Sequence, residues 1–426
     1  MGKRGADTLN FERRRTTKKG GCMVGALAGV KIVELAIWAA APAGGGIMAD
    51  WGAEVLKIED PDGGDPFRAF LSTGVGAAQT SSINGSFESD NRNKKSVAAD
   101  VRTKEGQEIV YRLVETADVF LTNFRPAALE RYKMTYADLK ARNPRLIYVG
   151  VTGYGPVGPE KDRAAFDYAG FWARAGMMAT IGEPDAPPPG QRPAMGDHTS
   201  GITVAGATAA ALFARERTGI GQEVQLSLYR TGMWVNSMDI QTALITRQNV
   251  PRLSRKNVGN PLFNCYRAKD DKWFQLVNLQ SDRHWPAFCD VIDRPDLLRD
   301  PRFIDAAARR ENGAALVAIL DEALLAKTRA EWGALFDAAE VFWAPVQTVE
   351  DVINDPQAKA NGGFVSAPIS SGETIAMVAT PIDFSATPAH TRTGAPELGQ
   401  HTEEVLLAHG YAWEELAKLK TQGVIG

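Results

Sequence analysis

The chain has 426 residues, of which 44% are hydrophobic and 23% charged, and its formal net charge is −3. This length exceeds one ordinary domain and predicts two, each with enough apolar residues for a core. The slightly negative charge argues against nucleic acid or an anionic membrane as a main partner, and no apolar run approaches the ~20 residues that span a bilayer.

Cysteine and histidine are too sparse to build a scaffold. The three cysteines, Cys22, Cys265 and Cys289, are widely spaced, which argues against a disulfide framework and for a reducing, cytoplasmic compartment. The five histidines form no HExxH motif and no Cys/His cluster. We therefore expect no structural or catalytic metal.

The N-terminal segment has a composition of its own. Its first 22 residues, MGKRGADTLNFERRRTTKKGGC, carry seven Lys or Arg against two acidic residues and show no apolar period. The segment lacks the apolar core of a secretory signal. We predict a disordered basic tail over residues 1–23, with a basic arm for a partner as the alternative.

The next stretch predicts the start of a parallel α/β sheet. A β-branched strand over 30–36 is followed by a glycine turn at 44–46, a helix to about Trp51 and a second strand over 54–59. The glycines fit the pattern GxGxxA, and an acidic residue ends the second strand. An NAD-dependent oxidoreductase is therefore one alternative for the function.

Residues 60–90 are rich in Asp, Gly, Pro and Ser, which predicts a long loop over the sheet edge. Further strand signals follow at 91–103, which opens into a helix over 104–115, and at 117–124, 143–159 and 223–228. Asn123, Phe124 and Arg125 end one of these strands, and Arg131 follows on a helix. Polar side chains at such strand ends bind ligands in open α/β sheets, whereas a solvated helix face is the alternative for the two arginines.

Aromatic residues cluster just before the last of these strands. The segment 166–178, FDYAGFWARAGMM, predicts an aromatic-rich helix in which Asp167 orients its neighbours or caps the helix. Phe166, Tyr168 and Trp172, with Trp38, either pack in the core or wall a pocket for a bulky or aromatic acid.

One carboxylate stands out at residues 193–201, PAMGDHTSG. Asp197 is predicted to lie on a glycine turn directly ahead of an uncharged apolar run, 201–214, that is typical of a buried helix. An Asp at the positive end of a helix is most often an N-cap. The alternative is a nucleophile toward an activated acyl group.

The rest of the chain predicts a second, smaller α+β domain. A long helix over 229–248 leads into strand-like residues 264–270 and 272–278, and into amphipathic helices over 282–293, 311–326 and 329–338. After Pro345 the pattern changes to hairpin-like strands and two C-terminal helices, 402–409 and 412–421. We predict a large domain from residues 24–228 together with 345–426, and a small domain with its linkers over 229–344.

Six stretches, in order, resemble the class III CoA-transferase family, which includes formyl-CoA and carnitine CoA-transferases. The matching pieces are GVKIVELA with MADWGAEVLKIEDPDGGDPFR, NRNKKSVAADVRTKEGQE, ADVFLTNFRPAALER, NPRLIYVGVTGYGPVGP, PAMGDHTSGITVAGATAAALFARERTGIGQEVQLSL and GAPELGQHTEEVL. They extend from about residue 28 to near the C-terminus. No single piece is diagnostic, but the ordered set is highly specific.

The resemblance implies a fold and a reaction. The fold is an interlaced homodimer, with a large Rossmann-like domain made from both chain ends and a small middle domain. The Asp of the GD motif, here Asp197, attacks the donor acyl-CoA thioester to give an acyl anhydride. The CoA thiolate then attacks the Asp197 carbonyl to leave an aspartyl-CoA thioester, and an acceptor carboxylic acid takes over. The substrates are thus acyl-CoA and a carboxylic acid, with no permanently bound cofactor.

The resemblance also implies a set of CoA contacts, with Arg102 and Arg131 as partners for the phosphates. The family's contacts correspond to Ala39, Ala40, Ala99, Arg102, Asn123, Phe124, Arg125 and Arg131. The sequence departs from formyl-CoA transferase at Ala39, which replaces a Gln, at Asp60, which replaces a basic residue, and around Gly259, where a glycine-run lid is shortened. These departures argue against formyl or oxalyl as the acyl group.

An α-methylacyl-CoA racemase is the alternative within the same fold. That reaction needs a base on each face of the α-carbon, supplied in racemases by a His–Asp pair. The corresponding position here is Phe166 or Asp167, and no histidine precedes Asp197. The sequence therefore favours a CoA-transferase over a racemase, over the oxidoreductase and over a non-catalytic CoA-binding protein.

Overall fold

The computed structural model describes residues 25–73 and 82–426. The basic tail that we predict over residues 1–23 lies outside this range. Within the described residues, no helix is both long and apolar enough to cross a membrane.

A six-stranded sheet forms the centre of the fold, in the order β3-β2-β1-β4-β5-β6, and all its neighbouring strands are parallel. The prediction of a parallel α/β sheet is confirmed. The strand order reverses between β1 and β4, which is where open α/β sheets bind ligands at the carboxyl ends of their strands. The six strands are β1 (Lys31–Leu35), β2 (Glu54–Glu59), β3 (Lys95–Ala98), β4 (Val119–Thr122), β5 (Ile147–Thr152) and β6 (Glu223–Ser227).

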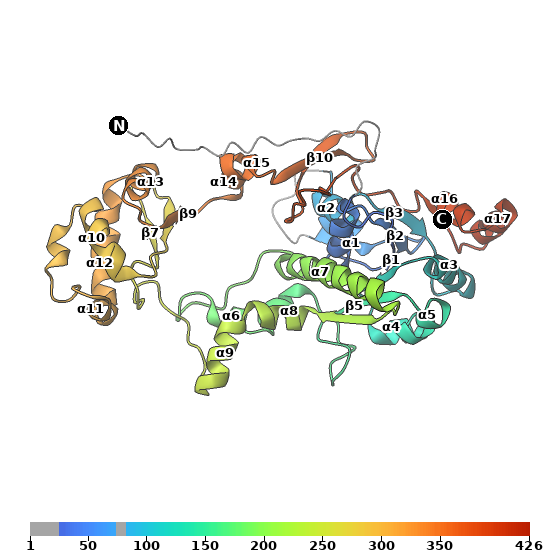
Figure 1. Cartoon of the computed structure of the whole chain (residues 1–426), viewed down its shortest axis with the longest axis horizontal. Helices are drawn as coiled ribbons and strands as arrows, with labels where there is room; N and C mark the ends of the chain where they lie inside the picture. Colours follow the sequence, from blue (N-terminus) through green and yellow to red (C-terminus); the bar gives the residue numbers. More distant parts are fainter. Residues whose placement is uncertain (1–24, 74–81) are drawn as a thin grey trace, which may run out of the picture.

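Helices cover both faces of this sheet, because successive strand side chains point to opposite faces and both sets are apolar. Ile32 packs with α1 and α7 on one face, and Val33 packs with α3, α5, α16 and α17 on the other. The two ends of the chain therefore share one core (Figure 1). The helices around the sheet are α1 (Ala40–Asp50), η1 (Pro66–Thr73), α2 (Gly85–Asn91), α3 (Lys104–Glu115), α4 (Pro126–Arg131), α5 (Tyr136–Arg142), η2 (Tyr168–Ala173), α6 (Met177–Thr180), α7 (Met195–Thr218), α16 (Thr402–Ala408) and α17 (Trp413–Thr421).

The three glycines predicted to form a turn lie inside α1, so that prediction is wrong. Each is a point of close approach to a different neighbour. A Cβ on Gly44 would lie 2.6 Å from Val204 Cγ1 of α7, and one on Gly46 would lie 2.7 Å from the backbone oxygen of Asp90 in α2. A Cβ on Gly45 would lie 1.9 Å from Glu34 Oε2 in β1. The GxGxxA pattern thus reflects helix packing, and the turn between β1 and α1 holds no glycine.

Two other helices differ from the predictions. Helix α7 begins at Met195 and not at Gly201, so it takes in Asp197. The long helix predicted over 229–248 is two helices, because Asn236 ends the first and its side-chain amide donates to the Ala175 carbonyl, 3.1 Å away. The helices are α8 (Leu228–Val235) and α9 (Ser237–Thr246).

The aromatic stretch after Phe166 is a short π-helix, η2, followed by a break. Gly176 supplies the break, since its φ of 93° is left-handed, and α6 follows it. The predicted loop over 60–90 also contains η1 and α2. The Asn84 side chain starts α2 by accepting a hydrogen bond from the Phe87 N–H, and the Phe87 ring is buried.

The middle of the chain has an apolar cluster of its own, separate from those of the six-stranded sheet (Figure 1). An antiparallel sheet, β7-β8-β9, packs there on the helices predicted from the amphipathic pattern. Its elements are β7 (Cys265–Arg267), β8 (Trp273–Leu276), α10 (Ser281–Val291), η3 (Pro295–Leu298), α11 (Ala306–Glu311), α12 (Gly313–Ala323), η4 (Leu324–Ala326), α13 (Arg329–Ala338) and β9 (Trp343–Pro345).

The chain then returns toward the parallel sheet through two short helices and a hairpin. The hairpin strands pair antiparallel over five residue pairs, which confirms the prediction of hairpin-like strands. These elements are α14 (Val349–Asn354), α15 (Pro356–Ala360), β10 (Phe364–Pro368) and β11 (Thr374–Val378).

The glycine contacts of α1 generate a stability prediction. We expect Gly44→Ala to lower the free energy of unfolding by ~1–3 kcal/mol, because the new methyl group overpacks the contact with Val204. Gly206→Ala in α7 is the matched control, since nothing lies within 4 Å of its Cβ position and alanine favours a helix. Urea unfolding measures both. Equal stability of the two variants would contradict the close packing of α1.

Candidate functional site

Asp197 lies in the first turn of α7, at the carboxyl edge of the parallel sheet. The N-cap of this helix is Ala194, which has a left-handed φ of 62° and no side chain that could cap. Asp167 caps the helix from outside instead: its Oδ2 accepts a hydrogen bond from the Gly196 N–H at 3.0 Å. The N-cap hypothesis for Asp197 is therefore wrong. Asp167 takes that role, and it does so for α7 and not for its own helix.

The Asp197 carboxylate is partly buried and accepts no hydrogen bond from any residue that the structure describes. Burial, together with the nearby Asp167 and Asp90 carboxylates, raises the pKa of Asp197 to about 7, although His198 acts to lower it. Burial also raises the pKa of Asp167, although the N–H of Gly196 lowers it. An unpaired carboxylate with a pKa near neutrality is typical of a functional site.

An ion pair beside Asp197 was missed by the sequence analysis. His198 Nε2 lies 3.2 Å from Oδ1 of Asp90, which is 4% exposed. This hydrogen bond raises the pKa of His198. The two residues lie on α7 and α2, and the glycines of α1 let both helices approach. The only signal in the sequence was the position of His198 directly after Asp197.

The turn between β1 and α1 lies at the point where the strand order reverses. Asn123, at the end of β4, holds this turn by two hydrogen bonds: its amide donates to the Ile37 carbonyl at 2.6 Å and its oxygen accepts from the Ile37 N–H at 3.0 Å. Ala39 and Ala40 follow on the same turn and are buried. The structure thus brings Asn123, Ala39 and Ala40 together.

Buried charges lie directly beneath this turn. Lys57 Nζ donates to the Ala36 carbonyl at 2.9 Å and pairs with Asp65 at 2.8 Å, and Asp65 accepts the Trp38 N–H at 2.9 Å. Lys94 pairs with Glu34 at 2.9 Å in the same cluster. The carboxylates raise the pKa of Lys57 despite its burial, whereas burial and the Lys57 charge lower the pKa of Lys94 to about 8.

The remaining predicted contacts follow β3 and β4, and we call their exposed members, Arg102, Arg125 and Arg131, the rim. Ala99 is buried, but Arg102 and Arg125 are exposed, and Arg102 already pairs with Asp100 at 2.7 Å and Asp60 at 3.2 Å. Arg131 is also exposed and donates to the Tyr132 hydroxyl at 2.8 Å. The guanidinium groups are therefore placed to meet a ligand from solvent.

Phe124 lies beside this rim and is partly buried. Its ring centroid is 6.3 Å from that of Tyr132, and the residue lines a cavity of about 140 Å³ together with Leu129 and Tyr136. Phe124 thus contributes an apolar surface next to the arginines.

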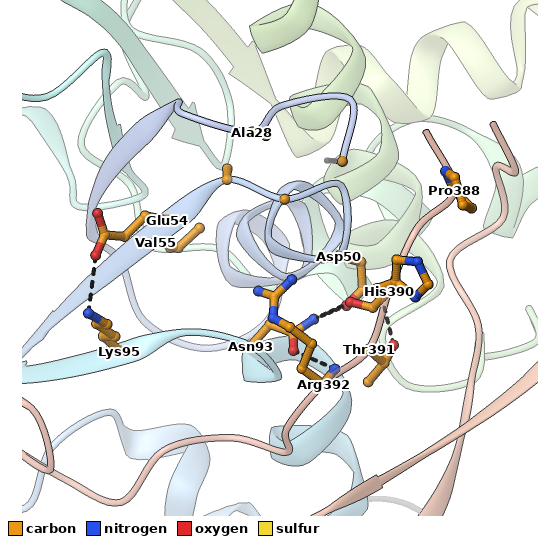
Figure 2. A pocket seen from close by; sticks show the side chains of 13 residues that line it. Ala28, Asp50, Glu54, Val55, Asn93, Lys95, Pro388, His390, Thr391 and Arg392 are labelled. Atoms are coloured by element: carbon orange, nitrogen blue, oxygen red, sulfur yellow. Dashed lines mark hydrogen bonds and ion pairs between the residues drawn. The ribbon is translucent and has the colours of Figure 1, made fainter. Parts of the chain in front are cut away.

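A larger cavity of about 640 Å³ lies at the opposite edge of the sheet, where the strands begin (Figure 2). Glu54, Lys95, Asn93 and Arg392 line it, and Figure 2 shows the Glu54–Lys95 ion pair on one side and the Asn93 contacts on the other. None of the predicted site residues lines this cavity. Its volume alone therefore does not mark it as the site of the chemistry.

The fold and site define an α/β protein with Rossmann strand order and a free carboxylate at its ligand-binding edge. The family model CoA-transferase family III matches residues 27–402. A solved structure of a CAIB/BAIF family protein from Brucella suis superposes with a TM-score of 0.80 at 32% identity, covering 90% of this chain and 99% of that one. The chain belongs to CoA-transferase family III and is an enzyme of the CoA-transferase class.

Two characterised relatives share most of their length with this chain. It is 38% identical to the (R)-2-hydroxy-4-methylpentanoate CoA-transferase of Clostridioides difficile, over 94% of this chain and 99% of that protein. It is 34% identical to the cinnamoyl-CoA:phenyllactate CoA-transferase of Clostridium sporogenes, over 92% and 95%. The family resemblance stated from the six sequence stretches is confirmed.

The electrostatics of the site generate a titration prediction. We expect the Asp197 carboxyl to have a pKa of about 7, well above that of a solvent-exposed Asp. His198→Gln removes a neighbouring positive charge, so we expect the Asp197 pKa to rise further. Carboxyl carbon NMR, with Asp197→Asn to assign the signal, measures both values. An Asp197 pKa near 4 in the folded protein, or a lower pKa in the His198→Gln variant, would contradict this description.

Proposed function

We propose that the enzyme transfers CoA from an acyl-CoA donor to a carboxylic acid through covalent intermediates on Asp197. The observation that supports this proposal is the carboxylate itself, which neither caps its helix nor pairs with any described cation. The helix N-terminus beside it supplies backbone N–H groups that stabilise negative charge.

The reaction begins at the donor thioester. An Asp197 carboxylate oxygen attacks the thioester carbonyl carbon, the C–S bond breaks, and CoA leaves as the thiolate. The thiolate then attacks Cγ of Asp197, which releases the donor acid as its carboxylate and leaves an aspartyl-CoA thioester.

The acceptor acid then carries out the same two steps in the opposite direction. Its carboxylate attacks Cγ of the aspartyl thioester, expels the thiolate and forms a second anhydride. The thiolate attacks the acceptor's carbonyl carbon, so that acceptor acyl-CoA leaves and the Asp197 carboxylate is restored. Each intermediate conserves the free energy of the thioester only while water is excluded.

The residues around the switch point of the sheet form the proposed CoA site. Arg102 and Arg131 pair with the CoA phosphates, because planar guanidinium groups bind phosphate in a bidentate manner. The remaining contacts that we propose are Ala39, Ala40, Ala99, Asn123, Phe124 and Arg125. Coenzyme A is thus a substrate here and not a resident group.

We further propose an acceptor with a branched or aromatic side chain. The names of the two characterised relatives specify 2-hydroxy-4-methylpentanoate and phenyllactate, which are 2-hydroxy acids with bulky apolar side chains. The site of this chain presents aromatic side chains of its own at Trp38 and Phe166, which lie in contact.

The exposed apolar surface of α8 and α9 supports a homodimer. Helix α9 buries none of its residues, and Trp234, Met238 and Ile245 are 80%, 84% and 72% exposed. Apolar surface of this extent marks an interface. We propose that two chains interlace around this surface, with the large domain from 24–228 and 345–426 and the small domain from 229–344 in each.

The nucleophile is tested by an isosteric substitution. We expect Asp197→Asn to lower kcat by at least 10³-fold, because an amide cannot form the anhydride, while the Tm and CoA binding stay unchanged. Hydroxylamine trapping during turnover, followed by peptide mass spectrometry, should label Asp197 in the parent protein only. Asp290→Asn, at an exposed position of α10 in the middle segment, is the matched control and should retain transfer.

Two results would contradict the proposal. Transfer at the parent rate in Asp197→Asn would show that Asp197 takes no part in the reaction. Exchange of the α-proton of a 2-methylacyl-CoA with deuterium, without movement of CoA between acids, would identify a racemase instead.

The dimer is tested on α9. We expect the double variant Met238→Glu, Ile245→Glu to sediment as a monomer, because it places charges within a buried apolar contact. The double variant Ile304→Glu, Val349→Glu, at exposed apolar positions outside α8 and α9, is the matched control and should remain a dimer. Analytical ultracentrifugation measures the mass. A parent protein that sediments as a monomer would contradict the dimer proposal.

A further inference from the structure

Trp38 adopts a backbone conformation that bulky side chains rarely take. Its φ of 63° lies in the left-handed region, where the Cβ of an ordinary residue crowds its own backbone. It occupies the turn between β1 and α1, directly before Ala39. Strain of this kind persists only where the surroundings enforce it, and it gathers at functional sites.

Hydrogen bonds on both sides of Trp38 enforce this conformation. Its own N–H donates to Asp65 at 2.9 Å, and the preceding residue, Ile37, is held twice by Asn123. Lys57 bonds both the Ala36 carbonyl and Asp65, so one buried cation links the two ends of the turn. These groups are polar and buried, and releasing the turn would leave them unpaired.

The enforced turn directs the indole ring toward Phe166. The two rings meet edge to face, with centroids 5.3 Å apart and planes at 90°, and Phe67 packs behind the indole at 6.1 Å. Phe166 is itself 56% exposed, so one side of the pair faces outward. The pair therefore forms an apolar wall. Phe67 covers one side of the wall, and the side that Phe166 presents is open to solvent.

This wall lies next to the nucleophile. Phe166 directly precedes Asp167, and Asp167 accepts the N–H of Gly196, the residue before Asp197. Asp167 thus joins the wall to the first turn of α7 at the carboxyl edge of the sheet.

We propose that Trp38 and Phe166 determine specificity by forming the wall of the acyl pocket, which selects acids with a large apolar or aromatic side chain. This inference rests on the proposed transferase function. The wall gains free energy from burying the side chain of a large acid, whereas a small acid leaves the rings in water. The strain at Trp38 holds the indole in place before the acid arrives.

The test compares three 2-hydroxy acids with methyl, isobutyl and benzyl side chains: lactate, 2-hydroxy-4-methylpentanoate and phenyllactate. Acetyl-CoA and 4-methylpentanoyl-CoA serve as donors, and mass spectrometry reads the product thioesters. We expect the parent enzyme to favour the two larger acids over lactate in kcat/KM. In Trp38→Gly and Phe166→Ala, we expect this ratio to fall at least tenfold, mainly through KM.

Trp38→Gly separates specificity from folding, because glycine adopts a φ of 63° without strain. Asp293→Gly is the matched control: Asp293 has a φ of 56° in the middle segment, remote from the wall. Its Tm should hold or rise while its substrate ratio stays at the parent value. Trp38→Phe keeps the strain with a smaller ring and should give an intermediate ratio, which tests the wall even where Trp38→Gly does not fold.

Two outcomes overturn the inference while transfer through Asp197 stands. One is a parent enzyme that prefers lactate, and the other is an unchanged ratio in both Trp38→Phe and Phe166→Ala. If the proposed function itself is wrong, the result is different: Asp197→Asn transfers CoA as fast as the parent.

Discussion

The close packing of α1 between α7 and α2 brings Asp197 and His198 to Asp90. Three consecutive glycines make it possible: Gly44 admits Val204 of α7, Gly46 admits the backbone of Asp90, and Gly45 leaves room for Glu34. Side chains at these positions would push the neighbouring helices apart. As a result, Asp197 and His198 on α7 lie within range of Asp90 on α2, and the carboxylate cluster forms around the first turn of α7.

A second constraint acts below the turn that precedes α1. Lys57, Lys94, Glu34 and Asp65 are buried together, and each depends on the others because an unpaired buried charge is costly. Their remaining hydrogen bonds go to the backbone of the turn, including the Trp38 N–H. Moving the turn would leave these buried charges unpaired. The network therefore keeps the turn rigid at the switch point of the sheet.

The proposed role of Asp197 as a nucleophile places two opposing requirements on its carboxylate. Partial burial excludes water, which would hydrolyse an anhydride, but burial also raises the pKa and favours the neutral, unreactive acid. The neighbouring His198 opposes that effect. Asp167 caps α7, so the Asp197 carboxylate is not needed as the cap of its own helix.

The sequence by itself determined the local structure and the family. Its β-branched runs predicted the parallel strands, its amphipathic periods predicted the middle helices, and six ordered motifs located Asp197, because such patterns depend on neighbours along the chain. Only the tertiary structure decided whether Gly44–Gly46 form a turn or a helix contact, that Asp167 caps α7, and that Asp90 pairs with His198. These contacts join residues far apart in the chain, so no local sequence pattern predicts them. Their geometry exists only once the sheet has brought the helices together.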